Sequence, residues 1–132
     1  MAITATATVL YDGQRNVIMQ FTGVGDGSGD ETNALKVDCS ALNPPCASVA
    51  IKKCTYDVGY GIVEMLWDRG AYDPVPFAEL TESGYPLNYK RINGLVNGGG
   101  PGATGNILFS TKGFELNSTY TVVLEMRKKD KL

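Results

Sequence analysis

Strict alternation of apolar and polar residues at the start of the chain constrains the fold more than any other feature. In ITATATVLY, residues 3–11, one face carries Ile3, Ala5, Ala7, Val9 and Tyr11, and the other carries Thr4, Thr6 and Thr8. This period of two is typical of a half-buried β-strand, and β-branched residues favour the same structure. Residues 15–23 resume the alternation after Asp12 and Gly13, a pair that favours a two-residue turn. The sequence therefore predicts a β-hairpin.

Segments of the same period recur along the chain, and none keeps a helical period beyond one turn. Further strands are expected at residues 35–40, 48–58, 62–68, 106–111 and 119–127. In 48–58 one face carries Val49, Ile51, Lys53, Thr55 and Asp57. The side chains expected in the core are Val63, Met65, Trp67, Tyr120, Val122, Leu124 and Met126.

Length and pattern together predict the fold class. The 132 residues suffice for one hydrophobic core, so residues 1–132 are expected to form one domain. We predict an all-β domain: a single antiparallel β-sandwich or jelly-roll-like domain of about seven to eight strands. Residues 69–105 are rich in Gly, Pro and Asn, and this long irregular segment is either a binding excursion or contains short irregular strands.

The charge distribution bears on the partners of the chain. A net charge of −2 argues against nucleic acid as the main partner. Four of the 12 basic residues lie in the last six positions, a short basic C-terminal tail that is either a solvated, mobile end or an arm that docks on an acidic surface. No signal-peptide pattern and no run of 18 apolar residues is present, so we expect a protein made in the cytoplasm without a membrane partner.

The composition argues against catalysis. The sequence has no histidine, which removes Ser-His-Asp and Cys-His sites and the commonest general base. Glu64 and Asp68 are expected to be solvated strand residues rather than a catalytic pair. The glycine-rich stretch 98–105 lacks the Lys and Ser or Thr of a phosphate-binding loop, so its glycines indicate positive φ angles instead. We predict that the chain is not an enzyme and holds no cofactor.

Two further sets of residues were weighed as metal or redox sites. Asp26, Asp30 and Glu31 offer oxygen ligands in a glycine-rich loop, which makes them a weak calcium candidate; the alternative is a hydrated hairpin loop. The three cysteines, Cys39, Cys46 and Cys54, are expected to be free and largely buried. A small disulfide loop between the first two is the alternative.

Several segments resemble a group of small tailed-bacteriophage proteins. They are residues 2–6 and 11–17 with Tyr-Asp-Gly-Gln-Arg-Asn-Val, 20–24, 26–32, 64–68, 102–109 and 124–128. The likeness spans nearly the whole chain, although none of these segments is a chemical signature. It implies a virion structural role, most plausibly decoration (cement) on the outer surface of the phage head, and it carries over no catalytic residue.

The resemblance also implies partners. These are the major capsid protein and further copies of the same chain, with a trimer favoured and the protein located on the capsid surface. The contacting parts are expected to be the N-terminal strand, the 69–105 segment and the basic tail, with interface candidates Ile3, Tyr72, Tyr85, Tyr89, Arg127, Lys128 and Lys129. Two alternatives remain: a carbohydrate- or receptor-binding β-sandwich that uses Trp67 and the tyrosines of 69–105 as a stacking platform, and a tail or neck component.

Overall fold

The computed structural model of the chain describes residues 3–27, 29–83, 86–92, 94–96, 98, 100 and 102–131. Within these residues the regular elements are β1 (Ile3–Asp12), β2 (Asn16–Gly25), β3 (Ala34–Val37), η1 (Cys39–Ala41), β4 (Cys46–Trp67), β5 (Val75–Ser83), β6 (Leu87–Asn88), η2 (Lys90–Ile92), β7 (Ile107–Lys112) and β8 (Thr119–Lys131). The two helical elements are 3-10 helices of three residues each. The all-β prediction is confirmed.

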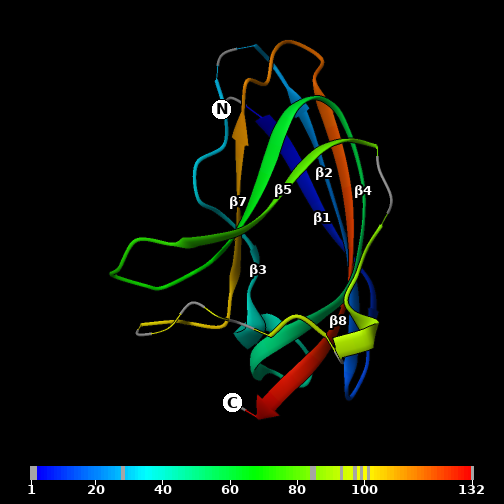
Figure 1. The fold of residues 1–132 in the computed structure, drawn as a ribbon, viewed down its shortest axis with the longest axis vertical. Helices are drawn as coiled ribbons and strands as arrows, with labels where there is room; N and C mark the ends of the chain where they lie inside the picture. Colours follow the sequence, from blue (N-terminus) through cyan, green and yellow to red (C-terminus); the bar gives the residue numbers. More distant parts are fainter. Residues whose placement is uncertain are drawn as a thin grey trace.

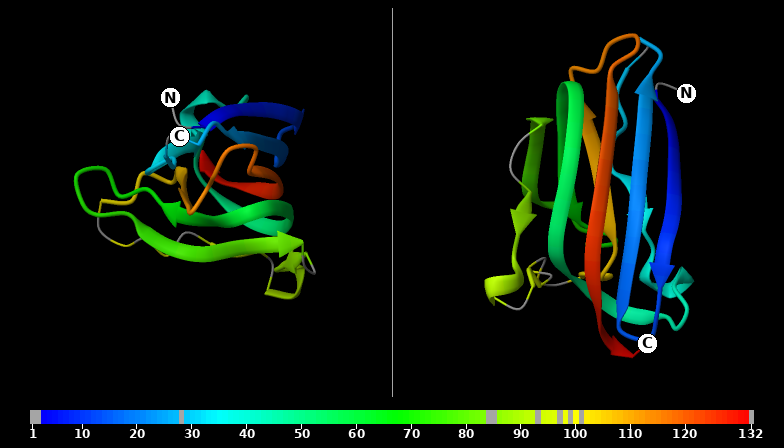
Figure 2. Two further views of the ribbon diagram at one scale, coloured as in Figure 1. Left: turned by 90° about the horizontal axis from the view of Figure 1, so that it is seen from above. Right: turned by 90° about the vertical axis from the view of Figure 1, so that its right-hand side faces the viewer.

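All eight described strands belong to one antiparallel sheet. The strand order is β1-β2-β8-β4-β7-β3. β8 and β7 pair with successive parts of one edge of β4, and β6 and β5 pair with its opposite edge. The 22-residue β4 is the centre of this arrangement, since its first part pairs with β8 and its last part with β7 (Figure 1). The sheet therefore changes direction along β4 and curls into a half-barrel, seen end-on in Figure 2.

The bend in β4 depends on one glycine. Gly61 has a φ of +92°, a left-handed conformation that residues with a Cβ rarely adopt. A Cβ at this position would also meet the Phe114 ring and the Lys112 carbonyl oxygen. The break expected between the strands at 48–58 and 62–68 is thus wrong: the chain bends there without leaving the sheet, and the two expected strands are one.

The core fills the concave side of the curled sheet. Phe109 of β7 makes edge-to-face contacts with Phe21 of β2 and Tyr120 of β8, with ring centroids 5.2 and 6.1 Å apart. These contacts connect β7 with β8 and β2, two strands that are not its neighbours in the sheet. The side chains that the sequence placed in the core are all buried there: Val63, Met65, Trp67, Tyr120, Val122, Leu124 and Met126.

The predicted hairpin is confirmed, with a different turn. β1 and β2 pair from Ile3↔Gly25 to Asp12↔Val17, so Asp12 is still in the ladder and the turn lies two residues later, at Gln14 and Arg15. The register shifts between Val9 and Tyr11. β1 lies at the edge of the sheet, where no opposite wall covers it, and its Val9 is 51% exposed instead of half-buried as expected (Figure 2, right).

A second register shift corrects the predicted face of residues 48–58. The pairing of β4 with β8 slips between Ile51 and Lys53, which leaves an extra residue in β4. Beyond this bulge Cys54 and Val58 point into the core, whereas the sequence pattern continued the inward face of Val49 and Ile51 through Lys53, Thr55 and Asp57. One inserted residue exchanges the two faces because side chains alternate along a strand.

Other boundaries also differ from expectation. The segment 69–105 contains the nine-residue β5 and the two-residue β6, so the prediction of short strands within it is confirmed. The strand expected at 35–40 is β3 and ends at Val37, before η1. The basic tail is neither a mobile end nor a separate arm, since residues 127–131 continue β8, paired with β4 as far as Lys131.

Candidate functional site

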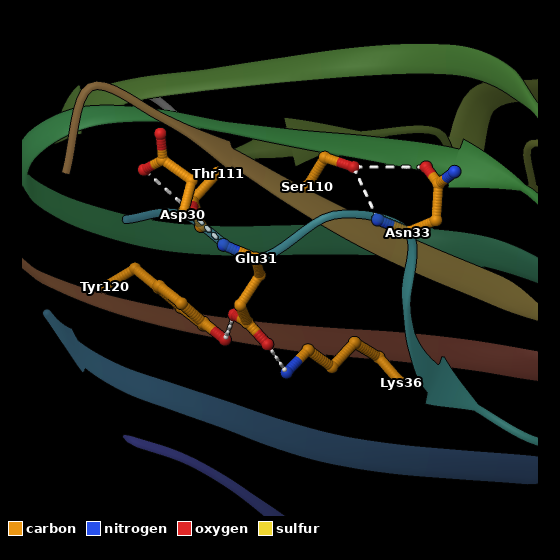
Figure 3. A network of polar contacts seen from close by, with 7 residues as sticks. All are labelled: Asp30, Glu31, Asn33, Lys36, Ser110, Thr111 and Tyr120. Atoms are coloured by element: carbon orange, nitrogen blue, oxygen red, sulfur yellow. Dashed lines mark hydrogen bonds and ion pairs between the residues drawn. The ribbon is translucent and has the colours of Figure 1, made fainter. Parts of the chain in front are cut away.

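A polar network between the 29–36 segment, β7 and β8 holds two of the three calcium candidates (Figure 3). One oxygen of Asp30 accepts hydrogen bonds from the Phe114 N–H at 2.9 Å and from the Thr111 hydroxyl at 3.2 Å. The other accepts one from the Gly113 N–H at 3.2 Å. These donors fasten the loop to the end of β7, so the Asp30 carboxylate has a structural role.

Glu31 lies deeper in the same network. Its two oxygens accept hydrogen bonds from the Tyr120 hydroxyl and from Lys36 Nζ, both at 2.7 Å. The side chains of Lys36 and Glu31 are only 8% and 12% exposed, so each charge depends on the other for compensation. Burial, followed by the hydrogen bond and charge of Glu31, raises the pKa of Tyr120 well above its ordinary value, and the phenol stays protonated.

This network changes the interpretation of the loop. The carboxylates of Asp30 and Glu31 both accept hydrogen bonds from donors elsewhere in the chain, so the loop is fastened to the sheet and is not a simple hydrated hairpin. Asp26, the third candidate, also interacts within the chain. In the part of the chain that the structure describes, no group of three or more Cys, Asp and Glu side chains could hold a metal ion.

The two carboxylates weighed as a catalytic pair also have structural partners. Glu64 of β4 forms an ion pair with Lys112 Nζ at 3.2 Å. Asp68 accepts hydrogen bonds from the Thr104 hydroxyl at 2.8 Å and from the Gly70 N–H at 3.1 Å. Asp68 thereby joins the end of β4 to the stretch before β7, and neither carboxylate is a simple solvated residue.

The glycine-rich stretch 98–105 ends in a tight contact with the sheet. Gly105 has a φ of +86°, and a Cβ there would collide with the Ala47 carbonyl of β4. The close approach of two backbones and the positive φ both require glycine at this position. Gly105 is therefore explained by backbone packing against β4.

All three cysteines are free and buried, as predicted. The Cys39 thiol donates a hydrogen bond to the Gly105 carbonyl at 3.2 Å, and Cys46 lies beside it. Burial, with a smaller effect of the neighbouring Cys46, raises the pKa of Cys39 to about 12. Burial alone raises the pKa of Cys54 to about 12, so these thiols are protonated and poor nucleophiles at neutral pH.

The basic interface candidates are less available than the sequence indicated. The Lys128 side chain is 5% exposed, and its Nζ forms an ion pair with Asp12 and donates a hydrogen bond to the Pro44 carbonyl. Arg127 and Lys129 are half-buried within β8. The prediction of an exposed docking arm is therefore wrong for Lys128, because its charge is used inside the molecule.

The aromatic candidates divide into separate groups. Tyr72 is 58% exposed, with the Arg69 guanidinium 5.0 Å from its ring centroid. Tyr89 is half-buried and packs against the core. Trp67 is 3% exposed and stacks on Phe77 with ring centroids 4.0 Å apart, so it cannot belong to a stacking platform. Tyr85 and the side chain of Ile3 lie outside the described residues.

A shallow groove lies where β1, β2, β4 and β8 adjoin, and none of the described aromatic candidates lines it. It measures about 240 Å³ and is lined by Tyr11, Asn16, Ile18, Lys52, Glu125 and Met126. Sites for small molecules typically occupy about 300–1,000 Å³ and enclose most of the ligand. This groove is smaller than such sites.

Exposed apolar side chains occur in two parts of the chain. Residues Tyr72, Ile92 and Val96 belong to the 69–105 segment, and we call them the excursion residues; they are 58%, 65% and 48% exposed. The second part is the edge strand β1, where Val9, Leu10 and Tyr11 are each more than half exposed. The sequence indicated both regions. It placed Val9 and Tyr11 on the same face of the strand, whereas the structure has a register shift between them.

Comparisons with known proteins gave no relative from which a function could be transferred. No protein-family model, no curated protein and no solved structure matches the chain. The structure as described contains no helix long and apolar enough to cross a membrane.

Proposed function

We propose that this chain is a non-enzymatic structural protein of a tailed-phage virion, which binds the outer surface of the capsid as a decoration protein. The observation that carries the proposal is the contrast between the acidic groups and the exposed apolar ones. Asp30, Glu31, Glu64 and Asp68 are held by partners within the chain. The excursion residues, by contrast, expose apolar surface that a protein partner would cover.

The excursion residues are the proposed contacts with the major capsid protein. Protein interfaces depend on a few aromatic or aliphatic anchors surrounded by polar groups. Ile92 of η2 supplies an aliphatic anchor. Tyr72 beside Arg69 supplies an aromatic and a cationic anchor in the loop between β4 and β5, which lies on the other side of the molecule from η2 and would make a separate contact (Figure 1). The resemblance of the sequence to small phage virion proteins supports the same partner.

The test combines localisation with a single substitution. Virus particles that contain the chain are purified, and its copies are counted by mass spectrometry and located by symmetry-averaged imaging. Ile92→Lys puts a charge into the proposed contact and should lower the copy number on the capsid at least tenfold, since losing about 1.4 kcal/mol weakens binding by that factor. Leu116→Lys is the matched control, because Leu116 is similarly exposed, at 66%, outside the 69–105 segment.

The outcomes separate the proposal from its rivals. Many copies in register on the capsid, reduced by Ile92→Lys and not by Leu116→Lys, would support it. A few copies at the tail tip, or specific binding of the isolated protein to a glycan array, would transfer the protein to the adhesion class. A few copies at the neck would make it a tail or neck component.

A further inference from the structure

Strand β1 has one free edge. In the described residues it pairs only with β2 and stands at the end of the strand order. The views in Figure 2 show it at the outer side of the sheet, beside β2. A free edge presents backbone donors and acceptors that another strand can pair with.

The hydrogen bonds of β2 determine which peptide groups of β1 are free. The Gly25 N–H donates to the Ser118 carbonyl, so Gly25 and the alternate residues before it direct their backbone groups toward β8. The residues between them bond to β1, and their partners are Thr4, Thr6 and Thr8. The N–H and C=O groups of Ala5, Ala7 and Val9 therefore point away from the sheet.

Before the register shift at Leu10, this edge lacks the charges and prolines that usually prevent strand addition. β3 is only four residues long and carries Lys36, and β5 contains Pro76 and Glu79. Short length, charge and proline are the devices that protect free edges. Residues 3–11 of β1 contain no charged residue and no proline. Their side chains from Thr6 to Tyr11 are exposed, so no other part of the described chain covers this stretch of the edge.

The open stretch has a defined end. The Asn43 N–H donates a 2.8 Å hydrogen bond to an Asp12 oxygen, and Lys128 contacts the other oxygen of the same carboxylate. The 42–44 segment thus occupies the space beside Asp12. An added strand can pair with the earlier part of β1 only.

We propose that the occupant of this edge is β1 of a second copy of the chain, paired antiparallel about a two-fold axis at Ala7. Ala7 then faces Ala7 of the second copy, and Ala5 faces Val9. These three hydrogen-bonded pairs exchange about six N–H···O bonds, two for each pair. Between them Thr6 faces Thr8 of the second copy, a cross-strand pair that stabilises sheets.

A second copy of the chain suits this edge because β1 is self-complementary. A two-fold contact places the same residues on both sides, so it requires a self-complementary strand. β1 meets that requirement because all its free peptide groups are on residues of one parity and no like charges oppose each other. The biological role of this pairing rests on the proposed function, because weak contacts between decoration proteins add up when they are repeated over a capsid shell.

The experiment is a charge exchange at the axis. Ala7 is exposed, and a lysine there keeps the outward-pointing backbone N–H and leaves the bonds of Thr6 and Thr8 to β2 in place. Ala7→Lys would place two ammonium groups directly opposite each other and abolish pairing, as would Ala7→Glu with two carboxylates. An equimolar mixture of the two variants should pair again, since opposite charges then face each other across the axis.

The mass in solution is measured by sedimentation, at about 100 μM because a single strand pair buries less than a standard interface. The wild-type chain is expected at twice 14.1 kDa and each charged variant at 14.1 kDa, with the mixture returning to the dimer. Ile92→Lys is the control and should stay dimeric. A monomeric or trimeric wild type, or a dimer that survives Ala7→Lys, would overturn the proposal.

The two proposals fail separately. Ala7→Lys removes self-association without altering the excursion residues, and Ile92→Lys alters one of those without touching β1. A monomeric wild type that still occupies the capsid would end the β1 pairing and leave the decoration role. A dimer sensitive to Ala7→Lys that is absent from the capsid would do the reverse.

Discussion

The Glu31 carboxylate accepts a 2.7 Å hydrogen bond from the Tyr120 hydroxyl, a residue 89 positions further along the chain. With Lys36 on its second oxygen, Glu31 joins the segment before β3 to the start of β8. The tyrosine ring also packs edge-to-face on Phe109 and Phe114. A residue that the sequence offered as a loop ligand is therefore part of what closes the half-barrel.

Tyr120→Phe tests this connection. The change removes only the hydroxyl and leaves one oxygen of the buried Glu31 without its donor. We expect a loss of about 1–3 kcal/mol in the free energy of unfolding, the usual cost of an unsatisfied buried polar group. Urea denaturation followed by tryptophan fluorescence measures it. Tyr60→Phe is the control, because Tyr60 is 58% exposed, and should change stability by less than about 0.5 kcal/mol. Equal losses in the two variants would contradict the structural role of Glu31.

The core prediction can be tested at Trp67. Its stacked position against Phe77 and 3% exposure predict that Trp67→Ala costs about 3–5 kcal/mol through lost burial and an unfilled cavity. Tyr72→Ala, at an exposed ring in the 69–105 segment, should cost less than about 0.5 kcal/mol. Thermal unfolding followed by circular dichroism compares the two. A Trp67→Ala melting temperature equal to that of the wild type would show that the ring is outside the core.

The sequence predicted the strands better than their faces and ends. Alternation located β2 and β8 because each keeps one register along its buried residues. β7 is buried on both faces and shows no alternation. It failed in β4, where the extra residue near Lys52 exchanges the faces and Gly61 bends the strand. A bulge has no signature in the local pattern, since its position is fixed by pairing with a distant strand. The same holds for Lys128, whose partner Asp12 lies 116 positions away.

Lys128 provides a prediction about charge. Lys128→Ala removes one member of a largely buried ion pair, whose Asp12 side chain is 19% exposed. We expect a loss of about 1–3 kcal/mol, below the 3–5 kcal/mol of a fully buried pair because Asp12 retains some access to water. Lys129→Ala, the neighbouring half-buried lysine with no ion pair among the described contacts, is the control. If the two variants unfold at the same urea concentration, the ion pair contributes nothing to stability.

Alkaline pH should weaken the fold through the buried thiols. Burial raises the pKa of Cys39 and of Cys54 to about 12 from an ordinary value of 9.0. The unfolded chain releases these protons near pH 9, whereas the folded chain retains them until near pH 12. Their contribution to stability is therefore complete below pH 9 and is lost progressively as the pH rises toward 12.

The measurement is the free energy of unfolding under reducing conditions at several pH values between 8 and about 10.5, the lower part of the interval in which the buried thiols stay protonated. It should fall with pH across this interval. Cys54→Ala removes one of the titrating groups, so its stability should fall less steeply, although it starts lower because a buried side chain has been shortened. Parallel curves for the wild type and Cys54→Ala would mean that the Cys54 thiol does not contribute to the alkaline loss. The slope difference, rather than the absolute stability, therefore decides whether burial of this thiol is what makes the fold sensitive to base.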